Sequence, residues 1–381
     1  MRKTRVLFLS KPYVAASYRQ KLRLMAQDPR FEIGLIVPLN WAGQDFEESS
    51  EPEEYWIRKL PIAFNGHNHF HFYRGLDAAV REFRPDIFNV EEEHYSLVTA
   101  QAVSLARKYG AASCFYTWQN IHKKYPPPFS WIERYVFRST ALAIAGNAEA
   151  IAILRKKGFQ KKALVLPQMG ADTDALQKIQ DTVTMSLREE LKLPREAFIV
   201  TFAGRLVEEK GIQHLIQALA RLQEPMIFLV ILGSGPYQEE LMRQAQEAGV
   251  AQYVLFTGSK KSVEVYRYLK ESDVLALPSL TRANWKEQFG RILVEAMLSG
   301  AVVIGSDSGE IPRVIRGGGL IFPEGQVSAL AERIRILFKD RRLHKKLAER
   351  GHKRALNHYT NTVIASRTLD LMQELITQPV S

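Results

Sequence analysis

The chain has 381 residues, of which 46% are hydrophobic and 24% charged, which excludes a disordered protein and allows two domains of ordinary size. The formal charge of +11 favours an anionic partner: a nucleic acid, a phosphorylated small molecule or an acidic membrane surface. Cys114 is the single cysteine, so a disulfide within the chain is excluded, and a reducing cytosol fits best.

Membrane-spanning and secretory segments are not indicated. No apolar run reaches the roughly 18 residues that a spanning helix requires. The first apolar run, Val6–Leu9, stops at Ser10, Lys11 and Pro12, and therefore predicts a β-strand rather than a secretory leader. We expect a cytoplasmic protein.

Short apolar runs alternate with amphipathic helical patterns along most of the chain. In the first half the predicted strands are residues 6–10, 32–37, 86–90, 112–118 and 141–146, and the predicted helices are 17–27, 72–83, 96–109 and 148–158. A second series has predicted strands at 198–204, 226–233, 253–258, 274–279, 301–306 and 319–322, and helices at 211–222, 237–249 and 263–272. This alternation predicts an α/β protein with two doubly wound parallel sheets.

Pro167 and Gly170 interrupt the pattern, and a polar stretch follows them to about Pro194. The expected domains are therefore residues 1–168 and 169–357, with one more helix over 358–381. Ligands of open parallel sheets bind beyond the carboxyl ends of the strands, so the loops that follow strands are where a site is expected.

The loop after strand 198–204 carries two cations. Arg205 and Lys210 precede a helix that starts at about Gly211, and two cations beside a helix N-terminus suit a diphosphate. Two unrelated surface bases would give the same pattern.

Two later loops carry small residues. Gly233 and Gly235 allow close backbone approach after the next strand, and Ser308 and Gly309 precede a short helix whose N–H groups suit an anion. Each signal is also that of an ordinary tight turn.

Glu287 and Glu295 are eight positions apart, with Phe289 and Gly290 between them. On one straight helix they would lie ~12 Å apart and ~80° out of line, too far to share a proton. If the helix starts near Phe289 or Gly290, Glu287 lies in the loop before it. The two carboxylates can then accept hydrogen bonds from hydroxyls at the two ends of an elongated ligand, such as a nucleotide sugar.

The segments "FAGRLVEEKGI", "LGSGP", "EQFGRILVEAMLSGAVVIGSDSGEIPRVI" and "GLIF", in that order, resemble the C-terminal domain of retaining glycosyltransferases of family 4, the glycosyl transferases group 1. The resemblance covers about residues 165–340 and implies the GT-B fold, two Rossmann-like domains that face each other across a cleft. It implies an N-terminal acceptor-binding domain, a C-terminal nucleotide-sugar-binding domain, and a last helix that returns to the N-terminal domain.

The resemblance also implies residue roles. Glu287 would contact the donor sugar, Glu295 the ribose, and Arg205 and Lys210 the diphosphate, with help from the backbone at Phe289 and Gly290. The implied reaction is hexosyl transfer with retention, with Glu287, Arg205 and Lys210 as the catalytic set and no enzyme nucleophile. The implied donor contacts are Arg205, Lys210, Gly233, Gly235, Glu287, Phe289, Gly290, Glu295, Ser308 and Gly309.

The N-terminal half departs from the family pattern. Many relatives have a glycine pair after the first strand, where this chain has Ala15, Ala16 and Ser17, small residues that keep the backbone approachable. Many have a histidine after the fifth strand, where this chain has Gln119, with His122 three residues later. His94 is a further candidate. Acceptor or sugar contacts are therefore expected at Ala16, His94, Gln119 and His122.

No metal constellation is evident. His67, His69 and His71 alternate without an accompanying acid cluster, as at a strand edge or in a loop. We expect no metal and no cofactor beyond the nucleotide-sugar donor, because cationic side chains and helix dipoles can hold the diphosphate.

Two other functions compete with glycosyl transfer. A sugar-nucleotide epimerase would share the GT-B architecture, but the Glu287 and Glu295 pair does not favour it. A nucleic-acid-binding protein would explain the charge, but it needs basic residues interleaved with aromatic ones, and the basic run 339–354 has no aromatic residue. We therefore expect no nucleic-acid partner, and the sugar, the base and the hydroxyl acceptor (a glycan, a lipid-linked sugar or a small molecule) stay open.

A lipid-linked acceptor would imply peripheral contact with an anionic membrane, at its cytoplasmic face. Two segments suggest it: a cationic helix with Arg19, Lys21 and Arg23, and residues 121–137, where Lys123 and Lys124 stand beside aromatic residues. Core aromatics and merely solvated charges are the alternative.

Overall fold

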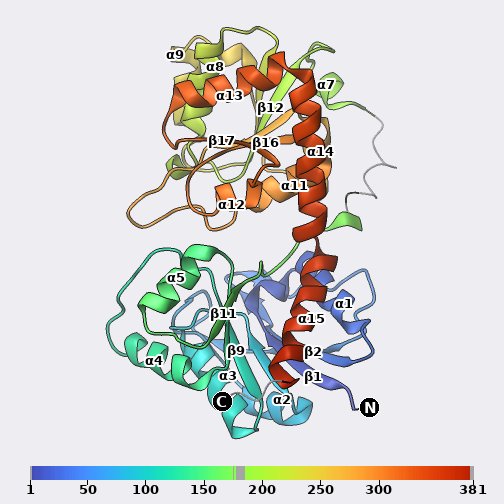
Figure 1. The fold of residues 1–381 in the computed structure, drawn as a ribbon, viewed down its shortest axis with the longest axis vertical. Helices are drawn as coiled ribbons and strands as arrows, with labels where there is room; N and C mark the ends of the chain where they lie inside the picture. The colour runs from blue at the N-terminus through green and yellow to red at the C-terminus, as the bar shows by residue number, and fades with distance from the viewer. Residues whose placement is uncertain (1, 175, 177–184, 378–381) are drawn as a thin grey trace. The chain divides into compact units, whose positions relative to one another are not determined.

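A computed structural model describes residues 2–174, 176 and 185–377 of the chain. It divides into two units: unit 1 contains the described residues up to Gly170 and those from Asn361 on, and unit 2 is Ala171–Thr360 (Figure 1). The sequence places these divisions at 168 and 357. Part of the predicted polar stretch and residues 378–381 lie outside the described residues.

Unit 1 is built on a seven-stranded parallel sheet with the order β11-β10-β9-β8-β1-β2-β5. Its strands are β1 (Thr4–Leu9), β2 (Phe31–Pro38), β5 (Trp56–Leu60), β8 (Ile87–Val90), β9 (Ala112–Thr117), β10 (Leu142–Ala145) and β11 (Lys162–Val165). Two short antiparallel pairs accompany it: β3 (Asn40–Trp41) with β4 (Gln44–Asp45), and β6 (Ile62–Ala63) with β7 (Phe72–Tyr73).

Helices cover both faces of this sheet because successive strand side chains alternate between the faces. Val6 and Phe8 of β1 belong to one core cluster, whereas Leu7 and Leu9 belong to another. The helices are α1 (Gln20–Ala26), α2 (Leu76–Phe83), α3 (Leu97–Lys108), α4 (Phe129–Ser139), α5 (Ala148–Lys156) and α15 (Asn361–Thr377), with short 3₁₀ turns η1 (Lys11–Val14) and η2 (Ala16–Tyr18).

The last described helix, α15, is part of unit 1 and lies beside α1 (Figure 1). Ile364 and Met372 of α15 are buried in the same cluster as Leu22 and Met25 of α1. The chain therefore leaves unit 1 after its first part, forms unit 2, and returns to complete the core of unit 1.

Unit 2 contains a six-stranded parallel sheet with the order β14-β13-β12-β15-β16-β17. Its strands are β12 (Phe198–Ala203), β13 (Ile227–Leu232), β14 (Val254–Gly258), β15 (Val274–Leu277), β16 (Val302–Ser306) and β17 (Gly319–Phe322). Its helices are α7 (Leu187–Glu190), η3 (Glu208–Lys210), α8 (Ile212–Leu222), α9 (Gln238–Glu247), η4 (Ala251–Tyr253), α10 (Ser262–Glu271), α11 (Arg291–Ser299), α12 (Ile311–Ile315), α13 (Val327–Lys339) and α14 (Arg341–His358).

The strand order fixes where a ligand can bind. In unit 2 the chain adds β13 and then β14 on one side of β12. It then crosses to the other side of β12 and adds β15, β16 and β17 there. The loops after β12 and β15 therefore diverge at a topological switch point, the place where open α/β sheets bind ligands. Arg205 and Lys210 follow β12, and Glu287 follows β15.

The prediction of an exposed cationic helix around α1 is wrong. Arg19 is fully buried and pairs with Glu53, and Lys21 is buried with Glu91. Arg23 keeps only 15% of its side chain exposed and pairs with Glu51. The acidic stretch 47–54 supplies two of these carboxylates from a distant part of the sequence, which the helical pattern alone does not reveal.

Candidate active site

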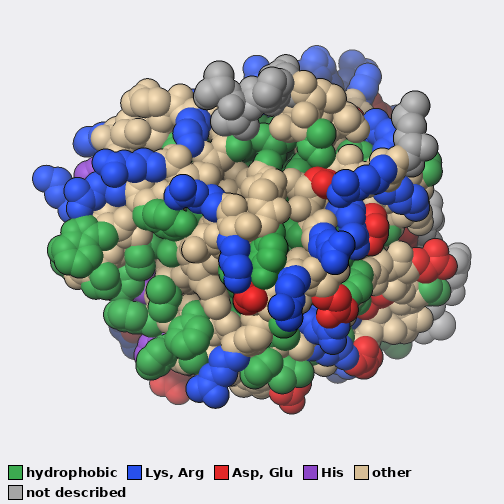
Figure 2. Space-filling view, turned by 90° about the horizontal axis from the view of Figure 1, so that it is seen from below, with side chains coloured by type: hydrophobic (Ala, Val, Ile, Leu, Met, Phe, Trp, Pro, Cys, Tyr) green, Lys and Arg blue, Asp and Glu red, His purple; other side chains and the backbone are tan. Residues whose placement is uncertain are grey.

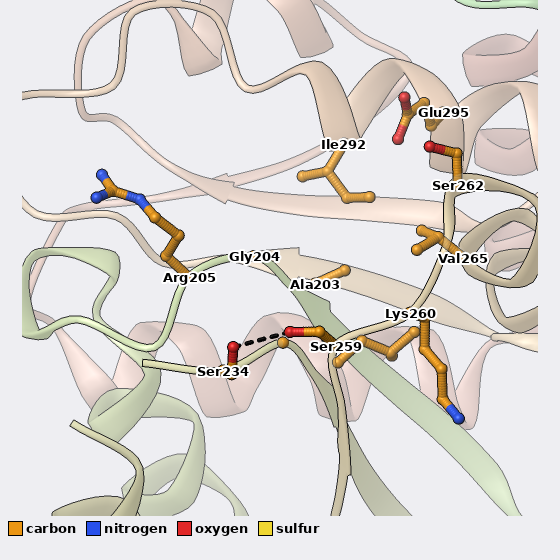
Figure 3. A pocket seen from close by; sticks show the side chains of 12 residues that line it. Ala203, Gly204, Arg205, Ser234, Ser259, Lys260, Ser262, Val265, Ile292 and Glu295 are labelled. Atoms are coloured by element: carbon orange, nitrogen blue, oxygen red, sulfur yellow. Dashed lines mark hydrogen bonds between the residues drawn. The ribbon is translucent and has the colours of Figure 1, made fainter. Parts of the chain in front are cut away.

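A pocket of about 370 Å³ opens at the carboxyl ends of β12, β13 and β14 in unit 2 (Figure 3). Arg205 and Glu295 lie on different sides of it, and Ser234 and Ser259 are joined by a hydrogen bond of 2.8 Å between their hydroxyls. The pocket is lined by Ala203, Gly204, Arg205, Leu232, Gly233, Ser234, Ser259, Lys260, Ser262, Val265, Ile292 and Glu295.

Glycines let the loops that shape this pocket pack backbone against backbone. At Gly233, with φ of 136°, a Cβ would lie 1.9 Å from the carbonyl oxygen of Gly204. At Gly235 a Cβ would lie 2.3 Å from the carbonyl oxygen of Leu206. The close approach predicted for these glycines is thus observed between two loops of the protein itself, and only Gly233 lines the pocket.

We expect Gly233→Ala to lower the thermal midpoint of unfolding clearly. Left-handed strain costs about 1–3 kcal/mol, and the clash with a carbonyl oxygen adds to it. Gly249→Ala is the matched control, because Gly249 also has a positive φ, of 69°, but a Cβ there meets nothing within 4 Å. Equal shifts in the two variants would contradict the role of loop packing.

Glu295 lies in α11 and presents its carboxylate to the pocket. Burial raises the pKa of this carboxyl, and the ion pair with Arg291 at 2.8 Å opposes that rise. A buried carboxylate whose charge is incompletely compensated is a strong acceptor for donors such as ribose hydroxyls.

Lys210 and Glu287 form a second cluster. Lys210 Nζ lies 2.7 Å from Glu287 Oε2, which also accepts a hydrogen bond of 2.8 Å from Ser279 Oγ. The ring of Trp285 flanks the ammonium of Lys210, 5.1 Å from Nζ to the ring centroid. Neither Lys210 nor Glu287 lines the pocket, and each holds the other in place.

The loop after β16 packs on the same cluster. Gly309 has φ of 55°, and a Cβ there would lie 1.9 Å from the carbonyl oxygen of Glu287. That oxygen accepts a hydrogen bond of 3.2 Å from the N–H of Glu310, while Ser308 Oγ lies 3.0 Å from Thr281 Oγ1. The loops after β15 and β16 are thereby locked together around Glu287.

Helix α11 starts at Arg291, so Glu287 lies in the preceding loop and Glu295 in the helix. Gly290 is the N-cap residue with φ of 74°, a conformation that favours glycine. Phe289 packs on the unit 2 core and against Tyr359, with ring centroids 5.6 Å apart. This turn aims the two carboxylates at separate places, as a long ligand requires.

Sequence reasoning did not single out several residues of these clusters. Ser234, Ser259 and Lys260 line the pocket, and Ser279 and Trp285 contact the second cluster. Their only signal is position, because each lies at or beyond the carboxyl end of a predicted strand.

In unit 1 the corresponding sheet edge carries a buried charge network. Lys21 Nζ donates to Glu91 Oε1 at 2.7 Å, and Gln168 Nε2 donates to Glu91 Oε2 at 3.0 Å. Glu92 is buried too; burial would raise the pKa of its carboxyl, but Lys11 and His71 together lower it. These groups organise the edge where acceptor contacts are expected.

The four predicted acceptor contacts differ in surroundings. His94 is fully buried, with Nε2 3.0 Å from Glu133 Oε2, which favours a structural role. Gln119 donates from Nε2 to Tyr125 OH at 3.1 Å, while its buried Oε1 has no hydrogen-bond partner among the described residues. His122 is exposed, and the N–H of Ala16 donates to Glu47.

In the described ranges, no group of three or more His, Cys, Asp or Glu side chains could hold a metal ion. His71, the last histidine of the alternating motif, is buried and 3.8 Å from Glu92, whereas His67 and His69 are exposed. Within the part of the chain that the structure describes, no helix is both long and apolar enough to cross a bilayer.

Solved structures with the same architecture define the class of fold. HepE of Anabaena in complex with UDP superimposes with a TM-score of 0.75, at 18% identity, and covers 98% of this chain and 100% of its own. Sucrose-phosphate synthase of Thermosynechococcus elongatus gives a TM-score of 0.73 at 17% identity, with 98% and 100% covered. The protein has the GT-B fold.

A family model matches part of the chain: residues 183–354 match the model of the glycosyl transferases group 1. The chain is 30% identical over 187 residues to the lipopolysaccharide core biosynthesis glycosyltransferase LpsE of Rhizobium meliloti, covering 49% of this chain and 52% of the relative.

A second relative is the GDP-mannose-dependent alpha-(1-6)-phosphatidylinositol monomannoside mannosyltransferase of Mycolicibacterium smegmatis. It is 31% identical over 209 residues, with 53% of this chain and 54% of the relative covered. The chain thus spans about half the length of these two curated relatives.

Proposed function

We propose that the protein transfers a hexosyl group, with retention of configuration, from a nucleoside diphosphate sugar to a hydroxyl acceptor. The observation that carries the proposal is the pairing, at one switch point, of a pocket bearing Arg205 and Glu295 with the Lys210 and Glu287 cluster. Cations and carboxylates arranged in this way suit a diphosphate and the hydroxyls on either side of it.

In the proposed reaction the bond from the anomeric carbon to the β-phosphate oxygen breaks, and its electron pair stays on the phosphate. Arg205 and Lys210 would stabilise that growing charge. The acceptor oxygen bonds to the anomeric carbon on the same face, and its proton passes to the departing phosphate. Glu287 would orient the sugar and Glu295 the ribose, with Gly233, Gly235, Phe289, Gly290, Ser308 and Gly309 shaping the donor site.

The direct test is nucleotide release. The protein is mixed with UDP-, GDP- and ADP-sugars and a panel of hydroxyl acceptors, and both nucleoside diphosphate and glycosylated product are measured. The anomeric configuration of the product, read by NMR, tests retention. We propose that no metal or other cofactor takes part, so EDTA should leave turnover unchanged. Inversion, or activity that returns only with added metal, would overturn those parts of the proposal.

The acceptor class is drawn from the relatives. Lipopolysaccharide core and phosphatidylinositol monomannoside occur in their names, which favours a lipid-linked hydroxyl acceptor over a small soluble one. We therefore propose that unit 1 binds the acceptor and that the protein works in peripheral contact with the cytoplasmic face of an anionic membrane.

Glu295→Ala and Glu287→Ala should differ in kind. Glu295 would contact the donor far from the reacting carbon, so its loss should mainly raise the KM for the donor. Glu287 would act at the reacting end, so its loss should mainly lower kcat. Steady-state kinetics with the best donor separates the two, and equal, purely KM effects would contradict this division.

A further inference from the structure

An exposed aromatic surface lies on unit 1, outside every cluster described above. Trp131 of α4 is 60% exposed and Phe70 is 48% exposed, and Phe70 contacts Phe129 edge to face, with ring centroids 4.8 Å apart. Pro126, Pro127 and Pro128 are exposed in the loop that leads into α4. Large exposed apolar patches on soluble proteins mark interaction sites. These six residues are called the aromatic surface below.

Basic side chains adjoin the aromatic surface in the sequence. Lys123 and Lys124 are exposed just before its proline run, and Arg134 and Arg138 are exposed on α4. The acid of this helix, Glu133, is engaged by Lys157 and His94. Seen from below, unit 1 presents hydrophobic side chains on the side where Figure 1 draws α4, with Lys and Arg side chains beside them (Figure 2).

The aromatic surface rests on a packed base. Phe129 lies next to His69, with ring centroids 5.6 Å apart, and His69 next to Tyr95 at 5.1 Å. Tyr95 and Tyr125 are 4.2 Å apart, and Lys157 lies over the ring of Tyr125. Phe70, which packs on Phe129, is therefore presented by ordered neighbours.

From this arrangement we infer that the aromatic surface and its flanking lysines dock unit 1 onto an anionic lipid bilayer. Aromatic rings favour the boundary between headgroups and acyl chains, and basic residues are drawn to anionic headgroups. Basic residues beside exposed rings favour an anionic membrane as the partner. A second copy of this positively charged chain would be repelled by the basic residues.

The docking segment is tied to the expected acceptor site. Tyr125, between Lys124 and the proline run, accepts the hydrogen bond from Gln119, the residue whose buried Oε1 has no partner among the described residues. A lipid-linked acceptor held at the bilayer would thus be presented beside Gln119. This consequence rests on the proposed function, whereas the docking itself does not.

Vesicle co-sedimentation tests the docking. Vesicles of equal parts phosphatidylglycerol and phosphatidylcholine should pellet the protein, whereas pure phosphatidylcholine vesicles should not, and added salt should weaken the binding. Phe70→Ser with Trp131→Ser, which leaves the charge intact, should weaken binding at least tenfold. Lys123→Glu with Lys124→Glu should do the same.

Two control variants test whether vesicle binding depends on the aromatic surface and its lysines. Lys345→Glu with Lys346→Glu makes the same charge change on exposed positions of α14, and Val263→Ser removes a side chain that is 54% exposed in unit 2. Both controls should bind vesicles like the wild type. Equal losses in test and control variants, or no pelleting of the wild type at low salt, would overturn the proposal.

Two further readouts distinguish contact with the bilayer from self-association. Brominated lipids should quench tryptophan fluorescence in the wild type and less in Trp131→Phe. Self-association in sedimentation velocity that disappears with Phe70→Ser and Trp131→Ser, without vesicle binding, would assign the surface to a second copy instead. Thermal stabilisation by nucleoside diphosphates should be unchanged in every variant, so that failure of docking and failure of the proposed reaction are seen separately.

Discussion

Lys210→Ala should slow the proposed glycosyl transfer on the order of 10²-fold or more, the typical loss when one preorganised group that stabilises developing charge is removed. Lys210 is fixed by Glu287 at 2.7 Å and by Trp285, so its charge is already in place before the donor binds. Arg205→Ala should have a loss of similar size. Steady-state measurement of kcat and kcat/KM gives the answer.

Lys210→Arg is expected to recover only part of the rate, because a planar guanidinium and a compact ammonium fit different oxygen arrangements. Arg243→Ala is the matched control, since Arg243 is exposed on α9 and pairs only with Glu240 and Glu247 in the contacts of the described chain. If Lys210→Ala kept the wild-type rate, residues other than Lys210 would have to contact the phosphates.

Lys21→Met should destabilise unit 1 by about 3–5 kcal/mol, because it leaves the Glu91 carboxylate buried without its cation. The side chains of both partners are almost completely buried, 2.7 Å apart. Urea unfolding followed by tryptophan fluorescence measures this change, since four of the five tryptophans lie in unit 1.

Two variants show whether burial is the cause. Lys21→Met with Glu91→Leu should recover most of the stability, since replacing a whole buried pair by apolar residues is often close to neutral. Arg30→Met breaks the more exposed pair with Asp28 and should lower the stability much less, because solvent screens an exposed ion pair. If Lys21→Met lowered the free energy of unfolding as little as Arg30→Met, solvent would have to reach and stabilise the Glu91 carboxylate.

The central strands of both sheets could be predicted because each contains a short run of buried, mostly apolar residues, as in β12 and β13, which are buried throughout. The edge strands β5 and β11 were missed. Every residue of β11 is exposed or half-buried, and only Leu60 of β5 is buried, so neither has the apolar run on which the prediction depends. Edge strands have one unpaired side and tolerate polar residues.

The candidate site was partly predictable for a similar reason. Lys210 and Glu287 follow strands at the switch point, so their proximity follows from the topology. The burial of Lys21 could not be predicted, because its partner Glu91 is brought to it by the pairing of β1 with β8. The hydroxyl pair of Ser234 and Ser259 likewise depends on the register of β13 and β14, which no local pattern fixes.

The return of α15 to unit 1 bears on the order in which the chain acquires its structure during synthesis. Domains generally fold as units while the ribosome is still adding residues. Unit 2 is contiguous, so it can fold as soon as Thr360 has emerged, whereas Leu22 and Met25 of unit 1 wait for Ile364 and Met372. Although unit 1 is translated first, its core is therefore the last to close, and a nascent chain arrested before α15 would present an open apolar face to chaperones.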